Sequence, residues 1–135
     1  MKYSLVVSVL FIVSFPVQAN LYLGGWSTHF SGYDLNNTHH LVAVEHRGWV
    51  AGTFVNSFDD RVYLGARDFR RDFRHLSTGI MLGLAYGYDD RDTRYSHRGF
   101  VPGAVPYIRV RTPFLIEPVF GLMGNAAFLS FSVNF

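Results

Sequence analysis

The last nine residues constrain the fold most, because apolar and polar side chains alternate along them. Every second residue is apolar: Ala127, Leu129, Phe131, Val133 and Phe135. The positions between them include Ser130, Ser132 and Asn134. Successive side chains of a strand point to opposite faces, so this segment predicts a strand with one apolar and one polar face. Such a strand fits a barrel wall between lipid and a polar lumen, or a half-buried strand of a soluble sheet.

The beginning of the chain favours the membrane interpretation. Lys2 supplies a positive charge, residues 5–15 form an apolar core, and Val17-Gln18-Ala19 fits a small-x-small cleavage site. The apolar run is shorter than the roughly 20 residues of a membrane-spanning helix, and no later stretch is long enough either. We therefore predict a cleaved signal peptide at 1–19 and, at 20–135, a membrane domain that must be a barrel. The terminal strand also resembles the one by which bacterial outer-membrane barrels are recognised for assembly, which implies an outer-membrane location.

An eight-stranded antiparallel up-and-down transmembrane β-barrel suits the length of this domain, since each strand needs about 9–11 residues. The clearest strand is 76–88, where large apolar residues alternate with small ones, as the narrow lumen of a small barrel requires. The other strands are expected at 21–30, 40–46, 49–56, 61–69, 107–111 with a start as early as 101, 114–121 and 126–135. The long polar connections, 30–39 and 89–100, would face the exterior, because outer-membrane barrels place their tight turns on the periplasmic side.

Composition argues against several classes of function. Cysteine is absent, so no disulfide holds the fold, and a closed barrel needs none. The formal net charge is +2, which implies no nucleic-acid partner. Six histidines are present, but His39 and His40 would point to opposite faces of a strand and no pair has a metal-ligand spacing, so we expect no metal. No motif indicates a cofactor, and we expect a monomer.

Charged residues at strand positions predict a paired-charge plug inside the barrel. The apolar neighbours of Arg109 would face lipid, which turns Arg109 inward, and the same alternation turns Glu117 inward on the next strand. The tight turn between the two strands would place these side chains nearly opposite each other. Glu45 and Arg67 are further candidates for the lumen. The main interpretation is structural, and a substrate or ion path is the alternative.

A tandem repeat occupies residues 67–70 and 71–74, each reading Arg-Asp-Phe-Arg. Two copies are too few for a solenoid. We expect the repeat to form the periplasmic turn between the fourth and fifth strands, because a charge cluster of this kind is usually solvated. Phosphate binding is the alternative role.

A histidine and a serine are expected at the outer rim of the barrel. His29 ends the first strand and Ser57 follows the third. Both strands run outward, so both residues would lie near the headgroups of the outer leaflet. A histidine within reach of a serine can act as general base in acyl transfer. The second strand lies between them and serine is common beside loops, so spacing alone leaves a purely structural role open.

Two runs of residues carry a resemblance to a known family: Trp26-Ser27-Thr28-His29-Phe30 and Gly48-Trp49-Val50-Ala51-Gly52-Thr53-Phe54-Val55-Asn56-Ser57-Phe58. With the proline-containing stretch at 100–106, they resemble the lipid A palmitoyltransferase family (PagP). The resemblance implies an eight-stranded outer-membrane barrel that moves a palmitoyl chain from a phospholipid to lipid A. Its partners would be the phospholipid and the lipopolysaccharide of the outer leaflet. The resemblance assigns catalytic roles to His29 and Ser57, with Asn56 in the place of the family's aspartate.

This chain departs from the family pattern in three respects. Asn56 lacks a carboxylate, the N-terminal amphipathic helix is missing because the first strand follows the cleavage site directly, and the loops are shorter. We take His29 as the base, Ser57 as its hydroxyl partner and Asn56 as a polar positioner.

Two alternatives to an acyltransferase stay open. One is a non-enzymatic barrel, structural, adhesin-like or engaged in surface exclusion, that acts through its extracellular loops. The other is a lipid A deacylase that uses the same residue types. The content of the lumen distinguishes an enzyme from a non-enzymatic barrel. An apolar pocket beside His29 would favour the enzyme. Charges along the whole height of the lumen would favour the non-enzymatic barrel.

Overall fold

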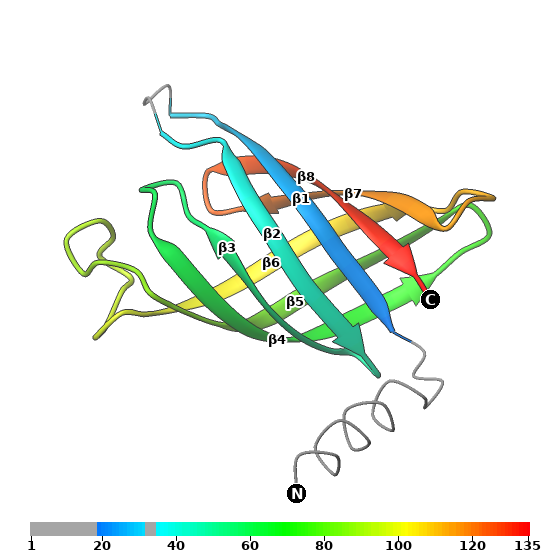
Figure 1. The fold of residues 1–135 in the computed structure, drawn as a ribbon, viewed down its shortest axis with the longest axis horizontal. Helices are drawn as coiled ribbons and strands as arrows, with labels where there is room; N and C mark the ends of the chain where they lie inside the picture. The colour runs from blue at the N-terminus through cyan, green and yellow to red at the C-terminus, as the bar shows by residue number, and fades with distance from the viewer. Residues whose placement is uncertain (1–18, 32–34) are drawn as a thin grey trace, which may run out of the picture.

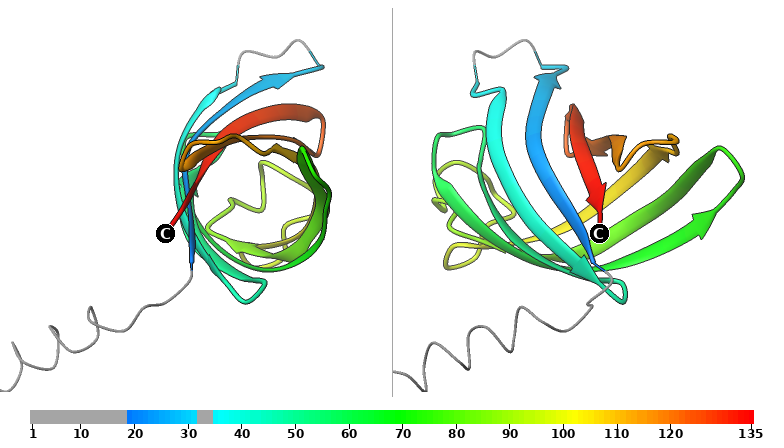
Figure 2. Two further views of the ribbon diagram at one scale, coloured as in Figure 1. Left: turned by 90° about the vertical axis from the view of Figure 1, so that its right-hand side faces the viewer. Right: turned by 45° about the vertical axis from the view of Figure 1, so that its right-hand side comes forward.

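Within residues 19–31 and 35–135, the part of the chain that the computed structural model describes, eight strands form one sheet that closes on itself (Figures 1 and 2). Every strand is antiparallel to both neighbours, and the pairing of β1 with β8 closes the barrel, which confirms the predicted up-and-down fold. The strands are β1 (Asn20–His29), β2 (Thr38–His46), β3 (Trp49–Val55), β4 (Arg61–Asp72), β5 (Leu76–Tyr86), β6 (Phe100–Val110), β7 (Ile116–Met123) and β8 (Ala126–Asn134). Apart from Ala19, the predicted signal peptide lies outside the described residues.

β6 is close to the longer of its two predicted ranges, and β4 extends beyond its predicted end. β6 begins at Phe100 and pairs with β5 along its whole length. β4 continues to Asp72, which pairs with Ser77 of β5. The tandem repeat therefore lies mainly in β4, and the expectation that it forms a turn is wrong. Its period of four residues is a multiple of the strand period of two, so residues 67–70 and 71–72 continue one strand with the same residue types on each face.

The two ends of the barrel differ in their connections. At one end, called the turn end, lie the start of β1, the end of β8 and the turns at 47–48, 73–75 and 111–115. At the other, called the loop end, lie the connections at 30–37, 56–60, 87–99 and 124–125. His29 and Ser57 lie at the loop end, as predicted from the directions of their strands.

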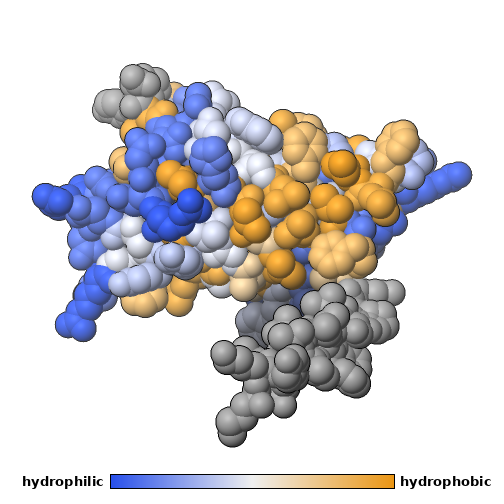
Figure 3. All heavy atoms as spheres, viewed as in Figure 1, coloured by the Kyte–Doolittle hydropathy of each residue, from blue (hydrophilic) through white to orange (hydrophobic). Residues whose placement is uncertain are grey.

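The outside of the barrel is apolar and carries exposed aromatic residues near both ends. Near the loop end, Tyr63, Tyr86 and Phe100 are neighbours on β4, β5 and β6, and the ring centroids of Tyr86 and Phe100 are 4.8 Å apart. Near the turn end, Trp49 and Phe69 are exposed. Figure 3 shows apolar side chains over the middle of one face and toward the turn end, with hydrophilic residues over the loop end. Aromatic girdles beside an apolar band are typical of transmembrane barrels.

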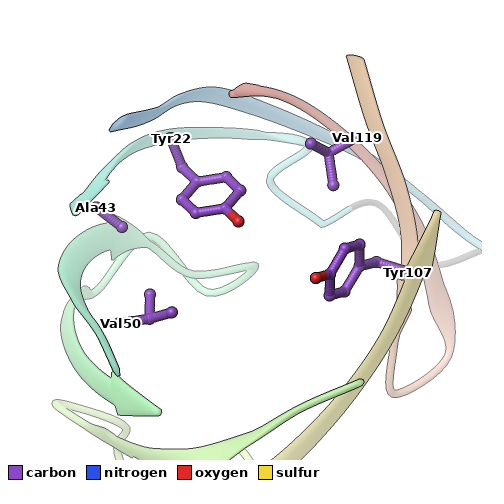
Figure 4. Close-up of a cluster of buried hydrophobic side chains, with 5 residues drawn as sticks. All are labelled: Tyr22, Ala43, Val50, Tyr107 and Val119. Carbon is purple, nitrogen blue, oxygen red and sulfur yellow. The ribbon is translucent and has the colours of Figure 1, made fainter. Parts of the chain in front are cut away.

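The side chains that face the lumen form three layers along the barrel. Apolar residues of the loop-end layer include Leu41, Phe54, Val62, Leu64 and Phe128. A middle layer consists of Tyr22, Ala43, Val50, Tyr107 and Val119, and both tyrosine hydroxyls point into the barrel (Figure 4). The turn-end layer contains Glu45, Asp68, Arg70, Arg109 and Glu117. The charges therefore gather at one end of the lumen rather than along its whole height.

The wall between β6 and β7 has little backbone pairing. Among the described residues, the two strands pair at three positions, from Tyr107↔Gly121 to Arg109↔Val119. Residues 100–106 of β6 pair with β5 alone, and they include Pro102 and Pro106. Proline has no N–H group to donate to a ladder. Near the loop end, β6 and β7 are therefore joined by fewer backbone hydrogen bonds than two fully paired strands.

Arg67 faces outward, so the expectation that it enters the lumen is wrong. Tyr63, on the same face of β4, is 59% exposed, whereas the adjacent Asp68 is 7% exposed. The guanidinium of Arg67 lies 5.1 Å from the ring centroid of Trp49, outside the barrel. Both faces of β4 carry apolar residues, so the sequence does not show which face points into the lumen. Pairing with the neighbouring strands decides this and turns Asp68 inward.

Candidate active site at the loop end

An irregularity in β1 decides which of its side chains enter the lumen at the loop end. The register of β1 shifts against β2 and β8 within residues 23–26. Gly24 and Gly25 have φ values of +86° and +104°, which residues with a Cβ rarely adopt. Before the shift, even-numbered residues face the lumen; after it, odd-numbered residues do. His29 therefore points inward, and Trp26 is 46% exposed on the outside.

His29 and Ser57, which the sequence places at the same rim, are in contact. Nε2 of His29 lies 2.8 Å from Oγ of Ser57, although β2 stands between their strands in the sheet. The segment just before β2 explains the approach, because the backbone N–H of Asn36 donates to the carbonyl of Ser57 at 3.0 Å. Its side chain also donates to the carbonyl of Asn56 at 3.0 Å. These bonds hold the connection after β3 beside the end of β1.

Asn56 acts on the turn rather than on the imidazole. Its side chain is buried, and Oδ1 accepts hydrogen bonds from the backbone N–H groups of Phe58 and Asp60 at 2.8 and 2.9 Å. Within the described part of the chain it has no hydrogen bond to His29. The polar positioner expected from the sequence thus positions Ser57 through the backbone. Nδ2 of Asn56 is buried without a hydrogen-bond partner there.

Sequence reasoning missed a second serine–histidine pair. Oγ of Ser27 lies 2.6 Å from Nε2 of His39, and Nδ1 of His39 lies 2.7 Å from the carbonyl oxygen of Val55. His40, which the sequence places on the opposite face from His39, is exposed. The bulge in β1 turns Ser27 inward. Its signal in the sequence is the Gly24-Gly25 pair inside a strand, because a glycine there often marks a bulge.

The predicted paired-charge plug is present at the turn end. Nε of Arg109 lies 3.3 Å from Oε2 of Glu117, and the two side chains are 5% and 10% exposed. The expected inward position of Glu45 is also confirmed, because Glu45 is buried and accepts a hydrogen bond from the side chain of Asn20. These contacts support the structural interpretation of the lumen charges.

Arg70 is the centre of a second group of charges, which the tandem repeat supplies. Its guanidinium lies 3.4 Å from Asp68, 3.3 Å from Asp72 and 3.5 Å from Glu45. Asp68 also accepts a hydrogen bond from the hydroxyl of Tyr107 at 2.8 Å. The spacing Asp-x-Arg-x-Asp puts all three repeat residues on the inner face of β4. Cavities of about 990 and 480 Å³ open beside these charges, at the opposite end of the barrel from His29.

Two features are absent from residues 19–31 and 35–135. In this part of the chain, no three side chains of His, Cys, Asp or Glu are gathered as a metal ion would require. None of these residues belongs to a helix with the length and hydropathy that a membrane crossing needs.

Comparison with known proteins supports the fold alone. No family model and no curated protein matches the chain. It is similar to a solved structure described as "De novo design of transmembrane beta-barrels", with a TM-score of 0.62 and 12% sequence identity. The match covers 90% of this chain and 98% of that one. The protein is thus an eight-stranded barrel of the transmembrane type.

Proposed function

We propose that this barrel lies in the bacterial outer membrane, with its loop end outward, and transfers an acyl chain from a phospholipid to lipid A. The observation that carries the proposal is the 2.8 Å contact between Nε2 of His29 and Oγ of Ser57 on the lumen side of the loop end. This is the level at which outer-leaflet lipids would meet the protein. The resemblance of both residues to the palmitoyltransferase motif supports the same activity.

In this function, His29 and Ser57 act on the acceptor hydroxyl. Its proton passes through Ser57 to Nε2 of His29, while the hydroxyl oxygen attacks the ester carbonyl of the phospholipid. The bond between the acyl carbon and the glycerol oxygen then breaks, and the imidazolium returns the proton to that oxygen. The products are an acylated lipid A and a lysophospholipid. Asn56 is a positioning residue, because it shapes the turn that presents Ser57.

The lumen offers an acyl chain an apolar environment below the rim. The loop-end layer is lined by apolar side chains such as Phe54 and Val62, and charges begin only below the tyrosines of the middle layer. We expect the acyl chain to enter this layer from the bilayer through the sparsely paired wall between β6 and β7. Hydrocarbon entering there would exchange one apolar environment for another, so its transfer costs little free energy.

The test is mass spectrometry of lipid A from cells with and without the protein. We expect an added acyl chain in its presence, and loss of that chain in the variants Ser57→Ala and His29→Ala. Ser96→Ala, in the loop at 87–99, is the matched control and keeps the modification. Heat-modifiable gel migration verifies that each variant folds. Unaltered lipid A in cells that contain folded wild-type protein would contradict the proposal.

A non-enzymatic role through the loops is the second candidate. The loop at 87–99 is organised by a bidentate contact from Arg91 to Asp89, with Nη2 2.7 Å from Oδ2, and by Asp90, which accepts from Ser96 at 2.5 Å. An ordered loop suits a surface that recognises a partner. A deacylase would instead release free fatty acid and leave lipid A one chain lighter, which the same mass spectra detect.

A further inference from the structure

We propose that Ser27 is a nucleophile that carries the acyl chain as a covalent ester, with His39 as its base. This inference rests on the proposed acyl transfer and replaces its single step by two. The geometry that points to it is a chain of contacts across three strands. Ser27 of β1 meets Nε2 of His39 of β2 at 2.6 Å, and Nδ1 of His39 meets the carbonyl of Val55 of β3 at 2.7 Å.

The carbonyl of Val55 fixes the protonation of the ring. A carbonyl oxygen only accepts hydrogen bonds, so Nδ1 of His39 must carry the proton. In the neutral imidazole, Nε2 then has a free lone pair, and the hydroxyl of Ser27 donates to it. The arrangement of nucleophile, base and orienting acceptor is the one that activates serine in acyl-transfer enzymes.

The His29–Ser57 pair lacks this third group. Within the described residues, His29 has a hydrogen-bond partner at Nε2 and none at Nδ1. No acceptor at Nδ1 therefore fixes the orientation of the His29 ring, whereas the carbonyl of Val55 fixes that of His39. Ser27 and His29 are two positions apart on the inward face of β1, so the pairs lie side by side, roughly 7 Å apart along the strand.

The segment that contacts both histidines also carries a candidate donor for the oxyanion. The segment Val55-Asn56-Ser57 contacts both histidines, through the carbonyl of Val55 and the hydroxyl of Ser57. Between them, Nδ2 of Asn56 is buried with no hydrogen-bond partner in the described residues, although Asn56 is only 1% exposed. An amide N–H held without a partner at an acyl-transfer site is a donor for the oxygen that becomes negative.

The covalent path has two steps, and His39 carries one proton in each. Oγ of Ser27 gives its proton to Nε2 of His39 and attacks the ester carbonyl of the phospholipid. The bond to the glycerol oxygen breaks, and His39 protonates that oxygen. The acceptor hydroxyl, held by His29 and Ser57, then gives its proton to His39 and attacks the ester on Ser27. The proton returns to Oγ of Ser27 as its bond to the acyl carbon breaks.

The experiment uses a fluorophosphonate probe on the whole mature protein, refolded in detergent. Oγ of Ser27 attacks phosphorus and fluoride leaves, so the adduct marks the activated serine. Trypsin separates the candidates, because Ser27 lies in the peptide that ends at Arg47 and Ser57 lies in 48–61. We expect the adduct on Ser27, its loss in Ser27→Ala, and labelling slowed at least about 100-fold in His39→Gln.

The controls separate reactivity from folding. Ser130→Ala is matched, because Ser130 is a buried lumen serine whose Oγ has no hydrogen-bond partner in the described residues. It should label at the wild-type rate. If Ser27→Ala fails to refold, Ser27→Cys replaces it. The chain has no other cysteine, so its alkylation by iodoacetamide should be roughly tenfold slower when His39→Gln is added.

The outcomes distinguish this inference from the proposed function. An adduct on Ser57, or folded protein that does not label, overturns the covalent role of Ser27. If lipid A modification nevertheless depends on His29 and Ser57, the acyl chain is transferred in the single step of the proposed function, without an ester on Ser27. Labelling of Ser27 with unaltered lipid A supports the nucleophile and excludes lipid A as its acceptor. Free fatty acid would then identify water as the acceptor.

Discussion

At the scale of single residues, the loop end depends on side chains that hold the backbone of its turns. Asn56 is the main example, because one oxygen accepts two backbone N–H groups of the turn that carries Ser57. Removing that oxygen leaves both N–H groups without it, at a cost of about 1–3 kcal/mol for each group that stays buried. The position of Ser57 against His29 depends on this turn.

Asn56→Ala and Asn56→Asp test this role. The alanine variant should lower the free energy of unfolding and abolish lipid A modification. Aspartate keeps an oxygen for both N–H groups, so it should refold like the wild type without raising activity above the wild-type level. Urea unfolding in detergent and lipid A mass spectra measure the two effects. Increased activity in Asn56→Asp would show that the residue orients the imidazole directly.

At the scale of elements, the bulge in β1 selects which face of the strand enters the lumen. Without it, Ser27 and His29 would point to lipid and Trp26 would point inward. A Cβ at Gly24 would lie 2.6 Å from the ring of Trp26, and its φ of +86° disfavours any other residue. The two glycines are therefore needed for the candidate site, although neither contributes a side chain to it.

Replacing Gly24 and Gly25 together by valine should force regular strand geometry and reverse the faces beyond it. Trp26 and Trp49 are the two tryptophans of the chain, so a Trp49→Phe background isolates Trp26. Quenching of its fluorescence by brominated phospholipid should fall in the double valine variant, and lipid A modification should be lost. Deleting Gly25 is the control, because it removes the extra residue and keeps the faces. Unchanged quenching in the valine variant would refute the bulge argument.

The loop at 87–99 supplies a pH-dependent element. The hydrogen bonds from Arg91 lower the pKa of Asp89 from 3.8 to about 2. Since the pKa is lower in the folded protein, the contact contributes fully above about pH 4 and is lost as the pH falls through 2. NMR titration of the Asp89 carboxyl should show a midpoint of about 2, which Arg91→Gln moves toward 3.8. An unchanged midpoint in that variant would exclude Arg91 as the cause.

At the scale of the whole molecule, the lumen is divided between an apolar loop end and a charged turn end. Each of these charges has an oppositely charged neighbour, with Arg109 beside Glu117 and Arg70 among three carboxylates. A buried charge that loses its partner is costly, so these contacts oppose the separation of β6 from β7 and of β2 from β4. The charges occupy the turn end of the lumen and do not enter the layer proposed for the acyl chain.

The pair Arg109–Glu117 gives the quantitative test. Glu117→Ala and Arg109→Ala should each lower the free energy of unfolding by about 3–5 kcal/mol, because each leaves the other charge buried and unpaired. The double variant should be less destabilised than the sum of the two, by about 0.5–3 kcal/mol. Additive effects in reversible urea unfolding would show that the two charges do not interact.

The sequence by itself determined the barrel, the lipid-facing side of most strands, the Arg109–Glu117 pair and the level of His29 and Ser57. These follow from local alternation and strand direction, which neighbouring residues encode. Tertiary structure decided the rest. Alternation along β4 is ambiguous, so its pairing with β3 and β5 decided which face points inward. As a result, Asp68 rather than Arg67 enters the lumen. The shifted register of β1 against β2 and β8 turned Ser27 toward His39. This contact joins two strands, so the alternation of residues along one strand cannot predict it.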